Sequence, residues 1–247
     1  MTALPDWPYP PLIAHRGGGV LAPENTLAGL RAGRAHGYDM AEYDAKLSLD
    51  RVPLLMHDDT VDRTTDGTGA AAQKTYAEMA ALDAGSWHSP PYAGEPVPAL
   101  RAVARYTLAN GMASNVEIKP CPGREAQTGT LVAQAVRELW REAARAPLLS
   151  SFSETALAAA ARAAPELPRA LLLEAALPHD WLERLRRHGC IALNMNERHI
   201  TAEIAERVRA AGFRLGAWTV NDPARAALLR DWGVDSLITD RIDLLRP

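Results

Sequence analysis

Residues 201–239, TAEIAERVRAAGFRLGAWTVNDPARAALLRDWGVDSLIT, contain the pattern that decides the fold. A helical stretch ends at Gly212, and an apolar run follows at Phe213–Trp218. A second helical stretch ends at Gly233 and leads into the apolar run Asp235–Thr239. Glycine is favoured just past the end of a helix because it adopts the left-handed backbone conformation without steric cost. We therefore interpret this stretch as two successive helix–turn–strand units.

The same succession of a helix, a glycine and an apolar run occurs earlier, at Gly37, Gly111 and Gly189. With the remaining apolar runs it predicts eight strands, most of them separated by helical segments: Leu12–His15, Met40–Ser48, Ser114–Lys119, Pro147–Phe152, Arg169–Glu174, Cys190–Asn194, Phe213–Trp218 and Asp235–Thr239. Alternating strands and helices are typical of a parallel sheet. Eight such units in 247 residues predict an α/β fold in which residues 1–247 form a single (β/α)8 TIM barrel domain. A doubly wound open sheet is the alternative.

One segment, residues 58–99, interrupts this alternation. It has no strong helix or strand pattern and is rich in turn-forming groups such as Asp66-Gly67 and Gly94-Glu95-Pro96. A structureless loop of this length is unusual inside a compact domain. We therefore predict a small insertion after the second strand, which covers one end of the barrel.

The composition excludes several classes of protein. The chain is 47% hydrophobic and 23% charged, so it can bury a large core and is not predominantly disordered. The net charge of −3 provides no basic excess for binding nucleic acid. No window approaches the ~20 apolar residues of a membrane span, so we expect no stable membrane insertion. Residues Met1–Pro11 lack the apolar core of a signal peptide, which favours a cytoplasmic protein, and the oligomeric state leaves no clear trace.

Polar residues gather at the ends of the predicted strands, where the catalytic groups of a barrel lie. The first strand ends at His15 and Arg16, and the short run Val52–Met56 ends at His57. Two histidines can serve as base and acid in one reaction because their ordinary pKa is close to neutral. Trp218 ends the seventh strand, where it could pack in the barrel or form an apolar wall for a substrate.

Three carboxylates form a candidate metal site. Glu42 and Asp44 lie on one face of the second predicted strand, and Glu117 and Lys119 lie on one face of the third. Adjacent parallel strands are about 4.8 Å apart, so carboxylates this close repel unless a cation lies between them. An all-oxygen set of ligands suits a hard divalent ion, Mg²⁺ or Ca²⁺. The alternatives are a solvated edge strand for Glu42 and Asp44 and a simple ion pair between Glu117 and Lys119.

The chain resembles the glycerophosphodiester phosphodiesterases from His15 to Asp240, with eight short motifs in the family order. The motifs are His15-Arg16-Gly17, Pro23-Glu24-Asn25-Thr26, Glu42-x-Asp44, His57-Asp58, Arg63-Thr64-Thr65-x-Gly67-x-Gly69, Glu117-Ile118-Lys119, Trp218-Thr219-Val220-Asn221 and Ile238-Thr239-Asp240. Two stretches depart from the pattern of many members, Ser48-Leu49-Asp50 and Pro98-Ala99-Leu100-Arg101. These departures concern the packing of the insertion and the substrate preference, and they leave the matched catalytic positions intact.

The resemblance implies a metal-dependent enzyme that hydrolyses a small-molecule glycerophosphodiester to glycerol 3-phosphate and an alcohol. It also implies a (β/α)8 barrel with a small insertion after the second strand. One divalent cation, Mg²⁺ or Ca²⁺, would be bound by Glu42, Asp44 and Glu117, and His15 and His57 would form the catalytic pair. The alternatives are a related barrel phospholipase that acts on intact lipid and a non-catalytic phosphodiester-binding barrel.

The remaining candidate residues surround this set. Arg16 and Lys119 would offset the negative charge of the phosphate in the transition state. Arg16 could instead pair only with Glu24. Glu24 and Asn25 are interpreted as the start of the first helix, and Asp240 as a cap of the last helix.

Overall fold

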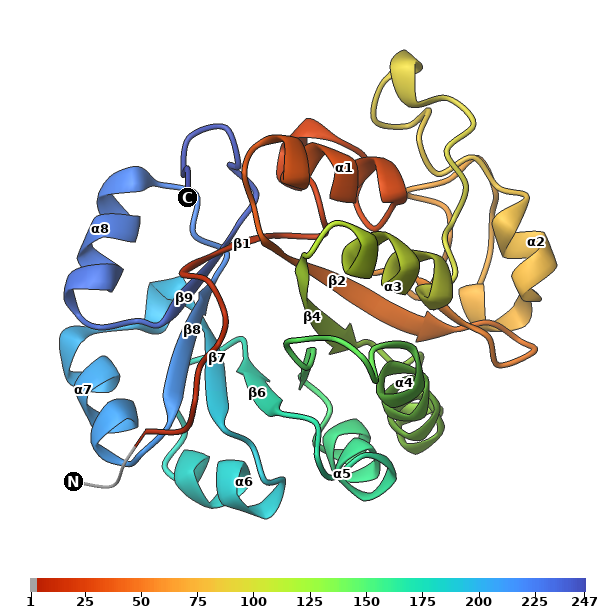
Figure 1. Cartoon of the computed structure of the whole chain (residues 1–247). Helices are drawn as coiled ribbons and strands as arrows, with labels where there is room; N and C mark the ends of the chain where they lie inside the picture. Colours follow the sequence, from red (N-terminus) through yellow and green to blue (C-terminus); the bar gives the residue numbers. More distant parts are fainter. Residues whose placement is uncertain (1–3) are drawn as a thin grey trace.

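Eight parallel strands close into a ring in the computed structural model, which describes residues 4–247 (Figure 1). The strands of the ring are β1 (Leu12–Ala14), β2 (Met40–Leu47), β4 (Ala113–Ile118), β5 (Leu148–Ser151), β6 (Arg169–Leu173), β7 (Ala192–Asn196), β8 (Arg214–Trp218) and β9 (Ser236–Thr239). Each strand pairs in parallel with the next around the ring. The pairing of Ala14 in β1 with Ala41 in β2 closes it. The barrel prediction is therefore confirmed, and the doubly wound open sheet is wrong.

Helices cover the outside of the barrel between successive strands (Figure 1). They are α1 (Leu27–Ala35), α3 (Leu100–Ala109), α4 (Glu125–Leu139), α5 (Glu154–Ala163), α6 (Trp181–Arg187), α7 (Ala202–Ala210) and α8 (Pro223–Asp231). Within residues 4–247, no helix combines the length and the apolar character that crossing a bilayer requires. Residues 1–3, the start of the amino-terminal segment Met1–Pro11, lie outside the described part of the chain.

The glycines that were predicted to end helices do so. All five follow the last residue of a helix by two positions and have φ between +58° and +89°: Gly37, Gly111, Gly189, Gly212 and Gly233. A side chain would be strained at these turns, so the glycines set the point at which each helix gives way to a strand. The strand after Gly189 begins two residues later than predicted, at Ala192 rather than Cys190.

The segment between β3 (Pro53–Leu55) and α3 forms its own small layer beside the barrel (Figure 1). β3 pairs antiparallel with the end of β2, and the segment contains the helix α2 (Tyr76–Ala80), which the sequence pattern did not predict. Five residues are too few to show a helical period. The available signal was the capping box of Thr75 and Glu78 at the start of α2. A separate apolar cluster that includes the fully buried Met79 gives this layer its own core.

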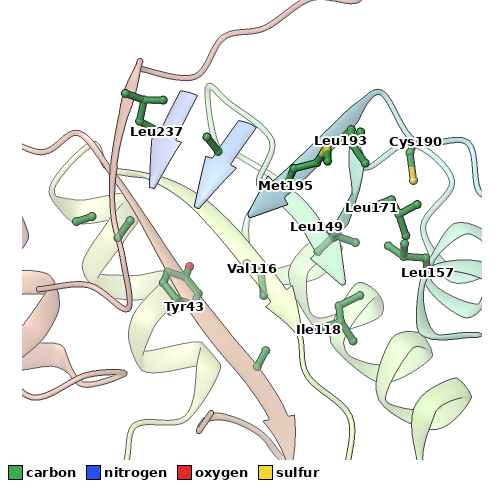
Figure 2. Packing of buried hydrophobic residues seen from close by; sticks show 14 of the residues in the cluster. Tyr43, Val116, Ile118, Leu149, Leu157, Leu171, Cys190, Leu193, Met195 and Leu237 are labelled. Atoms are coloured by element: carbon green, nitrogen blue, oxygen red, sulfur yellow. The ribbon is translucent and has the colours of Figure 1, made fainter. Parts of the chain in front are cut away.

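Alternation along the strands separates the apolar core from the polar mouth of the barrel. Tyr43, Val116, Leu149 and Leu171 belong to the large cluster between the strands and the helices (Figure 2). A second cluster takes the opposite face of the strands and fills the barrel toward their amino ends: Tyr9, Ile13, Met40, Ala113, Leu148, Ala170, Ala192 and Ile238. The inward positions nearer the carboxyl ends are mostly polar, so the fold brings them together at one open end.

Candidate functional site

Polar side chains converge at the carboxyl end of the barrel. Glu42 and Asp44 are two residues apart on β2 and share one face, and Asp44 pairs in register with Glu117 of β4. A pocket of about 180 Å³ opens there. Its lining residues are His15, Arg16, Glu42, His57, Asn115, Glu117, Lys119, Ser150, Phe152, Leu172, Glu174, Trp218, Thr219 and Ile238. The candidate residues from the sequence thus line one pocket, except for Asp44, which is buried beside it.

The three carboxylates Glu42, Asp44 and Glu117 meet in a buried cluster. Their candidate ligand oxygens all lie within 4.8 Å of one another. Burial and the neighbouring carboxylates raise the pKa of Glu42, and burial together with Asp44 raises the pKa of Glu117 to about 7. Glu42 Oε1 is buried and has no hydrogen-bond partner among the described residues. This donor set fits a divalent cation, because a cation would neutralise the repulsion and engage the unpaired oxygen.

Two cationic side chains border this cluster. Lys119 Nζ lies 2.9 Å from Glu117 Oε1 and 3.7 Å from Asp44 Oδ1, while Arg16 Nε lies 3.6 Å from Asp44 Oδ2. Burial would raise the pKa of Asp44, but Arg16 and Lys119 outweigh burial and hold that pKa below its ordinary value. Arg16 Nη1 also binds Glu24 Oε1 at 2.8 Å. Arg16 therefore forms the ion pair with Glu24 and lines the pocket at the same time.

Each of the two pocket histidines is held by an aspartate. His15 Nδ1 lies 2.6 Å from Asp240 Oδ1, and His57 Nδ1 lies 2.6 Å from Asp58 Oδ1. The hydrogen bond from Arg63 lowers the pKa of Asp58. Burial would raise the pKa of Asp240, but His15, Asn221 and Arg16 together outweigh burial and lower it. An ionised carboxylate only accepts hydrogen bonds, so each Nδ1 donates one. Each Nε2 is therefore the nitrogen left to exchange a proton.

Asp240 is the partner of His15, and its interpretation as a helix cap is wrong. The described chain after β9, residues 241–247, contains no helix for it to cap. Asn221 Nδ2 donates a hydrogen bond to Asp240 Oδ2 at 3.1 Å and orients the carboxylate. Because β9 pairs with β1, the ends of these two strands meet although His15 and Asp240 are 225 residues apart in sequence.

Asn25 supports the carboxylate cluster, whereas the sequence had suggested that it only starts the first helix. The N-cap of α1 is Thr26, whose side chain accepts a hydrogen bond from Gly29 N. Asn25 has a left-handed φ of 58°, its Nδ2 donates to Asp44 Oδ2 at 2.8 Å, and its Oδ1 accepts from Asp44 N at 2.9 Å. The first hydrogen bond orients the Asp44 carboxylate, and the second holds Asn25 against the backbone of β2.

Arg63 connects the His57–Asp58 pair to the first loop of the barrel. Its guanidinium contacts both oxygens of Asp58, at 2.6 and 3.0 Å, and both oxygens of Glu24, at 2.8 and 2.9 Å. Burial lowers the pKa of His57, so its neutral form prevails at pH 7. The sequence offered Arg63 only as part of a family motif, because no local pattern predicts a pair 39 residues apart.

An apolar wall faces the charged side of the pocket. Trp218 meets Phe152 edge-on, with ring centroids 5.3 Å apart. Lys119 Nζ lies 5.2 Å from the centre of the Phe152 ring, so Phe152 contacts both the cationic side chain and Trp218. Trp218 lines the pocket as expected, whereas Phe152 was not among the predicted site residues. It is the aromatic residue that directly follows β5.

Comparisons with known proteins place the chain in one family over nearly its whole length. The model of the "Glycerophosphoryl diester phosphodiesterase family" matches residues 15–244. A glycerophosphodiester phosphodiesterase of Caldanaerobacter subterraneus subsp. tengcongensis is 33% identical over 233 residues, which cover 93% of each chain. A solved structure of an Oleispira antarctica phosphodiesterase, in complex with the product sn-glycerol-3-phosphate, has a TM-score of 0.87 and 36% identity and covers 94% of this chain and 93% of its own.

A second solved structure, a glycerophosphodiester phosphodiesterase from Agrobacterium tumefaciens, is 28% identical with a TM-score of 0.79, and the alignment covers 99% of this chain and 98% of that one. The family match extends over nearly the whole barrel and includes every candidate site residue. The resemblance that the eight motifs indicated is thus confirmed. The chain belongs to the glycerophosphoryl diester phosphodiesterase family of enzymes.

Proposed function

We propose that the chain hydrolyses glycerophosphodiesters to glycerol 3-phosphate and an alcohol, with one divalent cation and a pair of histidines. The observation that carries the proposal is a single pocket lined by two histidines that aspartates hold, by two members of the buried carboxylate cluster and by two cationic side chains. Relatives named glycerophosphodiester phosphodiesterase support the reaction. The solved phosphodiesterase with sn-glycerol-3-phosphate supports the product.

Glu42, Asp44 and Glu117 would bind the cation, either Mg²⁺ or Ca²⁺, since oxygen ligands suit both ions. The bound ion would supply Lewis-acid stabilisation of charge on the phosphate and on the attacking hydroxyl. Arg16 and Lys119 would hold the phosphate and offset its negative charge in the transition state. Trp218 and Phe152 would contact the carbon skeleton of glycerol.

The two histidines would move the protons. One Nε2 takes the proton from the glycerol 2-hydroxyl, whose oxygen attacks phosphorus and displaces the alcohol. The other Nε2 gives its proton to the departing alcohol oxygen. Water then opens the cyclic phosphate by the reverse proton transfers and yields glycerol 3-phosphate. A groove of about 520 Å³ shares His57, Glu117, Lys119 and Phe152 with the pocket and offers the alcohol a way out.

The whole chain would act as one catalytic domain, with residues 58–99 as an insertion that contributes to the site. Asp58 and Arg63 lie at the start of this segment, and both support His57. The segment also contacts the first loop of the barrel through Arg63 and Glu24. These contacts favour a direct role in catalysis for the insertion over a passive cover.

The direct test is release of glycerol 3-phosphate from glycerophosphocholine by the purified protein. We expect release with added Mg²⁺ or Ca²⁺ and its loss after chelation. Activity that survives complete chelation would contradict the metal dependence. No release from any glycerophosphodiester with either metal would contradict the reaction and favour a phosphodiester-binding barrel. Release from intact phospholipid in preference to glycerophosphocholine would favour the phospholipase.

Replacing Asp240 with asparagine should impair turnover without impairing substrate binding. The amide can present its nitrogen to His15 Nδ1 and favour the wrong tautomer of the ring. The same change costs up to about 10⁴-fold in kcat in the histidine–aspartate pair of serine proteases, so we expect a loss of about 10²–10³-fold here, with KM little changed. Asp243→Asn, at the half-buried pair of Asp243 with Arg241, is the matched control. A loss confined to KM would contradict the positioning role.

The effect of divalent cations on thermal stability should grow with pH. The pKa of Glu117 is about 7 in the folded, metal-free protein, above its ordinary value of 4.5. Its contribution to stability is therefore fully present below about pH 4.5 and is lost as the pH rises to about 7. A cation that replaces the proton removes this loss. We expect a Tm increase of about 5–10 °C at pH 8 with metal at about 100 times its Kd, and a smaller increase at pH 5.

Differential scanning fluorimetry across this pH range, with and without Ca²⁺ or Mg²⁺, measures the effect. Glu42→Gln should abolish the metal-induced increase and should stabilise the metal-free protein at pH 8, because it removes one of the repelling charges. Glu125→Gln, outside the cluster, should behave as the unmodified protein does. A metal-induced increase that is the same at pH 5 and pH 8 would contradict the prediction.

A further inference from the structure

The pocket has two ends of different chemistry. The carboxylate cluster lies at one end, together with the two cationic residues that line the pocket, Arg16 and Lys119. Each of these two side chains is already paired with a carboxylate of the cluster. The ends of β6 and β8 contribute Leu172, Trp218 and the polar Thr219 to the lining, together with one anionic side chain, Glu174. The proposed function uses the first end and leaves the role of Glu174 open.

Glu174 directly follows β6 and is held in place without a cation. Its Oε1 accepts a hydrogen bond from Asn196 Nδ2 at 3.0 Å, and Asn196 is itself fixed by accepting a hydrogen bond from Arg198 N at 3.1 Å. Among residues 4–247, Glu174 takes part in no ion pair, and its second oxygen receives no hydrogen bond. The carboxylate can therefore accept a hydrogen bond from a ligand, and it repels a second anionic group.

The strand arrangement and the volume of the pocket limit the kind of ligand that can contact Glu174. β4 and β6 are separated by one strand, so these two strands lie roughly 10 Å apart. The register places Ala170 level with Glu117, so Glu174 lies four residues further toward the carboxyl end of the barrel. A ligand whose phosphate lies at Lys119 would extend a short polar chain in this direction to reach Glu174. The volume of about 180 Å³ is below the roughly 300–1,000 Å³ of typical ligand pockets. It suits a three-carbon unit and leaves little room for an acyl chain.

We propose that Glu174 accepts a hydrogen bond from the terminal hydroxyl of the glycerol unit and thereby selects deacylated glycerophosphodiesters over lysophospholipids. This inference rests on the proposed function and adds the residue that contacts the end of the glycerol unit farthest from the phosphate. A lysophospholipid carries an ester in place of that hydroxyl, so it offers Glu174 no donor and adds bulk in a small space. Discrimination arises because the unmatched substrate forgoes a hydrogen bond to a charged acceptor, whose side chain is otherwise exposed to solvent.

The test compares two substrates that both keep the 2-hydroxyl nucleophile. Glycerophosphocholine has the terminal hydroxyl, whereas 2-hydroxypropyl phosphocholine has a hydrogen in its place, and choline release measures both. We expect the unmodified enzyme to prefer glycerophosphocholine by about 10–100-fold in kcat/KM. Glu174→Ala should lose this preference through slower turnover of glycerophosphocholine alone, and Glu174→Gln, which keeps an acceptor oxygen, should recover part of it. Glu203→Ala, an exposed carboxylate on α7, is the matched control.

A third substrate, lysophosphatidylcholine, completes the test of Glu174. Lysophosphatidylcholine should be a poor substrate for the unmodified enzyme and a relatively better one for Glu174→Ala. An active enzyme that treats the two phosphocholine substrates alike, or a variant that loses both activities equally, would overturn the role of Glu174 alone. An unmodified enzyme that releases choline from neither substrate with Mg²⁺ or Ca²⁺ would overturn the proposed function, and this inference with it.

Discussion

Replacing His57 with alanine is expected to lower kcat by about 10²–10⁴-fold, the usual loss when a general acid or base is removed. His57 lines the pocket, its Nδ1 is held by Asp58, and burial lowers its pKa so that it is neutral at pH 7. Alanine removes the proton carrier and keeps the three side chains of the carboxylate cluster. Glycerol 3-phosphate release under saturating metal and substrate measures the loss. The Tm should change little, because the ring is partly exposed at the pocket surface.

His15→Ala should lower kcat by the same order, since one ring accepts the proton of the attacking hydroxyl and the other donates a proton to the departing alcohol. The double variant should be only slightly worse than either single variant, because residues that act as a unit have non-additive effects. His36→Ala is the matched control: His36 is exposed at the end of α1, where its ring bonds Ala32 O. Near-normal turnover in both single variants would contradict the catalytic pair. A large Tm loss in either variant would make folding, rather than proton transfer, the cause.

The barrel could be predicted because its rules are local. A glycine two residues past each of five helices marks where helix gives way to strand, and the count of the resulting units points to a closed ring. The carboxylates could be predicted as a cluster for the same kind of reason. Residues two apart on one strand share a face, and the neighbouring strand carries Glu117 beside Asp44.

The residues that hold the site side chains in place could not be predicted from local patterns. Asp240 meets His15 only because the last strand pairs with the first, and Arg63 meets Glu24 only because the second-strand insertion folds back on the first loop. Asn25 looks like a helix start in sequence because asparagine is favoured there. Its left-handed backbone instead turns the side chain toward Asp44. Such contacts depend on closure of the ring, which no local pattern contains.

Replacing Glu117 with glutamine is expected to abolish activity while leaving the metal-free protein at least as stable. The change removes one of three candidate ligands and keeps the volume of the side chain. A metal ion typically contributes several kcal/mol of transition-state stabilisation, so kcat/KM should fall by at least about 10³-fold. At pH 8 the same change removes a buried negative charge whose pKa is raised to about 7. The repulsion from Asp44 and Glu42 therefore falls, and the metal-free Tm should stay level or rise.

These opposite effects separate a metal ligand from a residue that merely supports the fold. A structural ion pair between Glu117 and Lys119 would lose stability on substitution, because Lys119 would keep only the more distant Asp44, at 3.7 Å. Glu174→Gln changes a carboxylate of the same pocket outside the cluster and should keep its metal-induced Tm increase. A Glu117→Gln protein that still gains thermal stability from Ca²⁺ or Mg²⁺ as the unmodified protein does would rule out this cluster as the metal site. One that loses that gain, retains its fold and is inactive would establish Glu117 as a ligand, because only the cation links the three results.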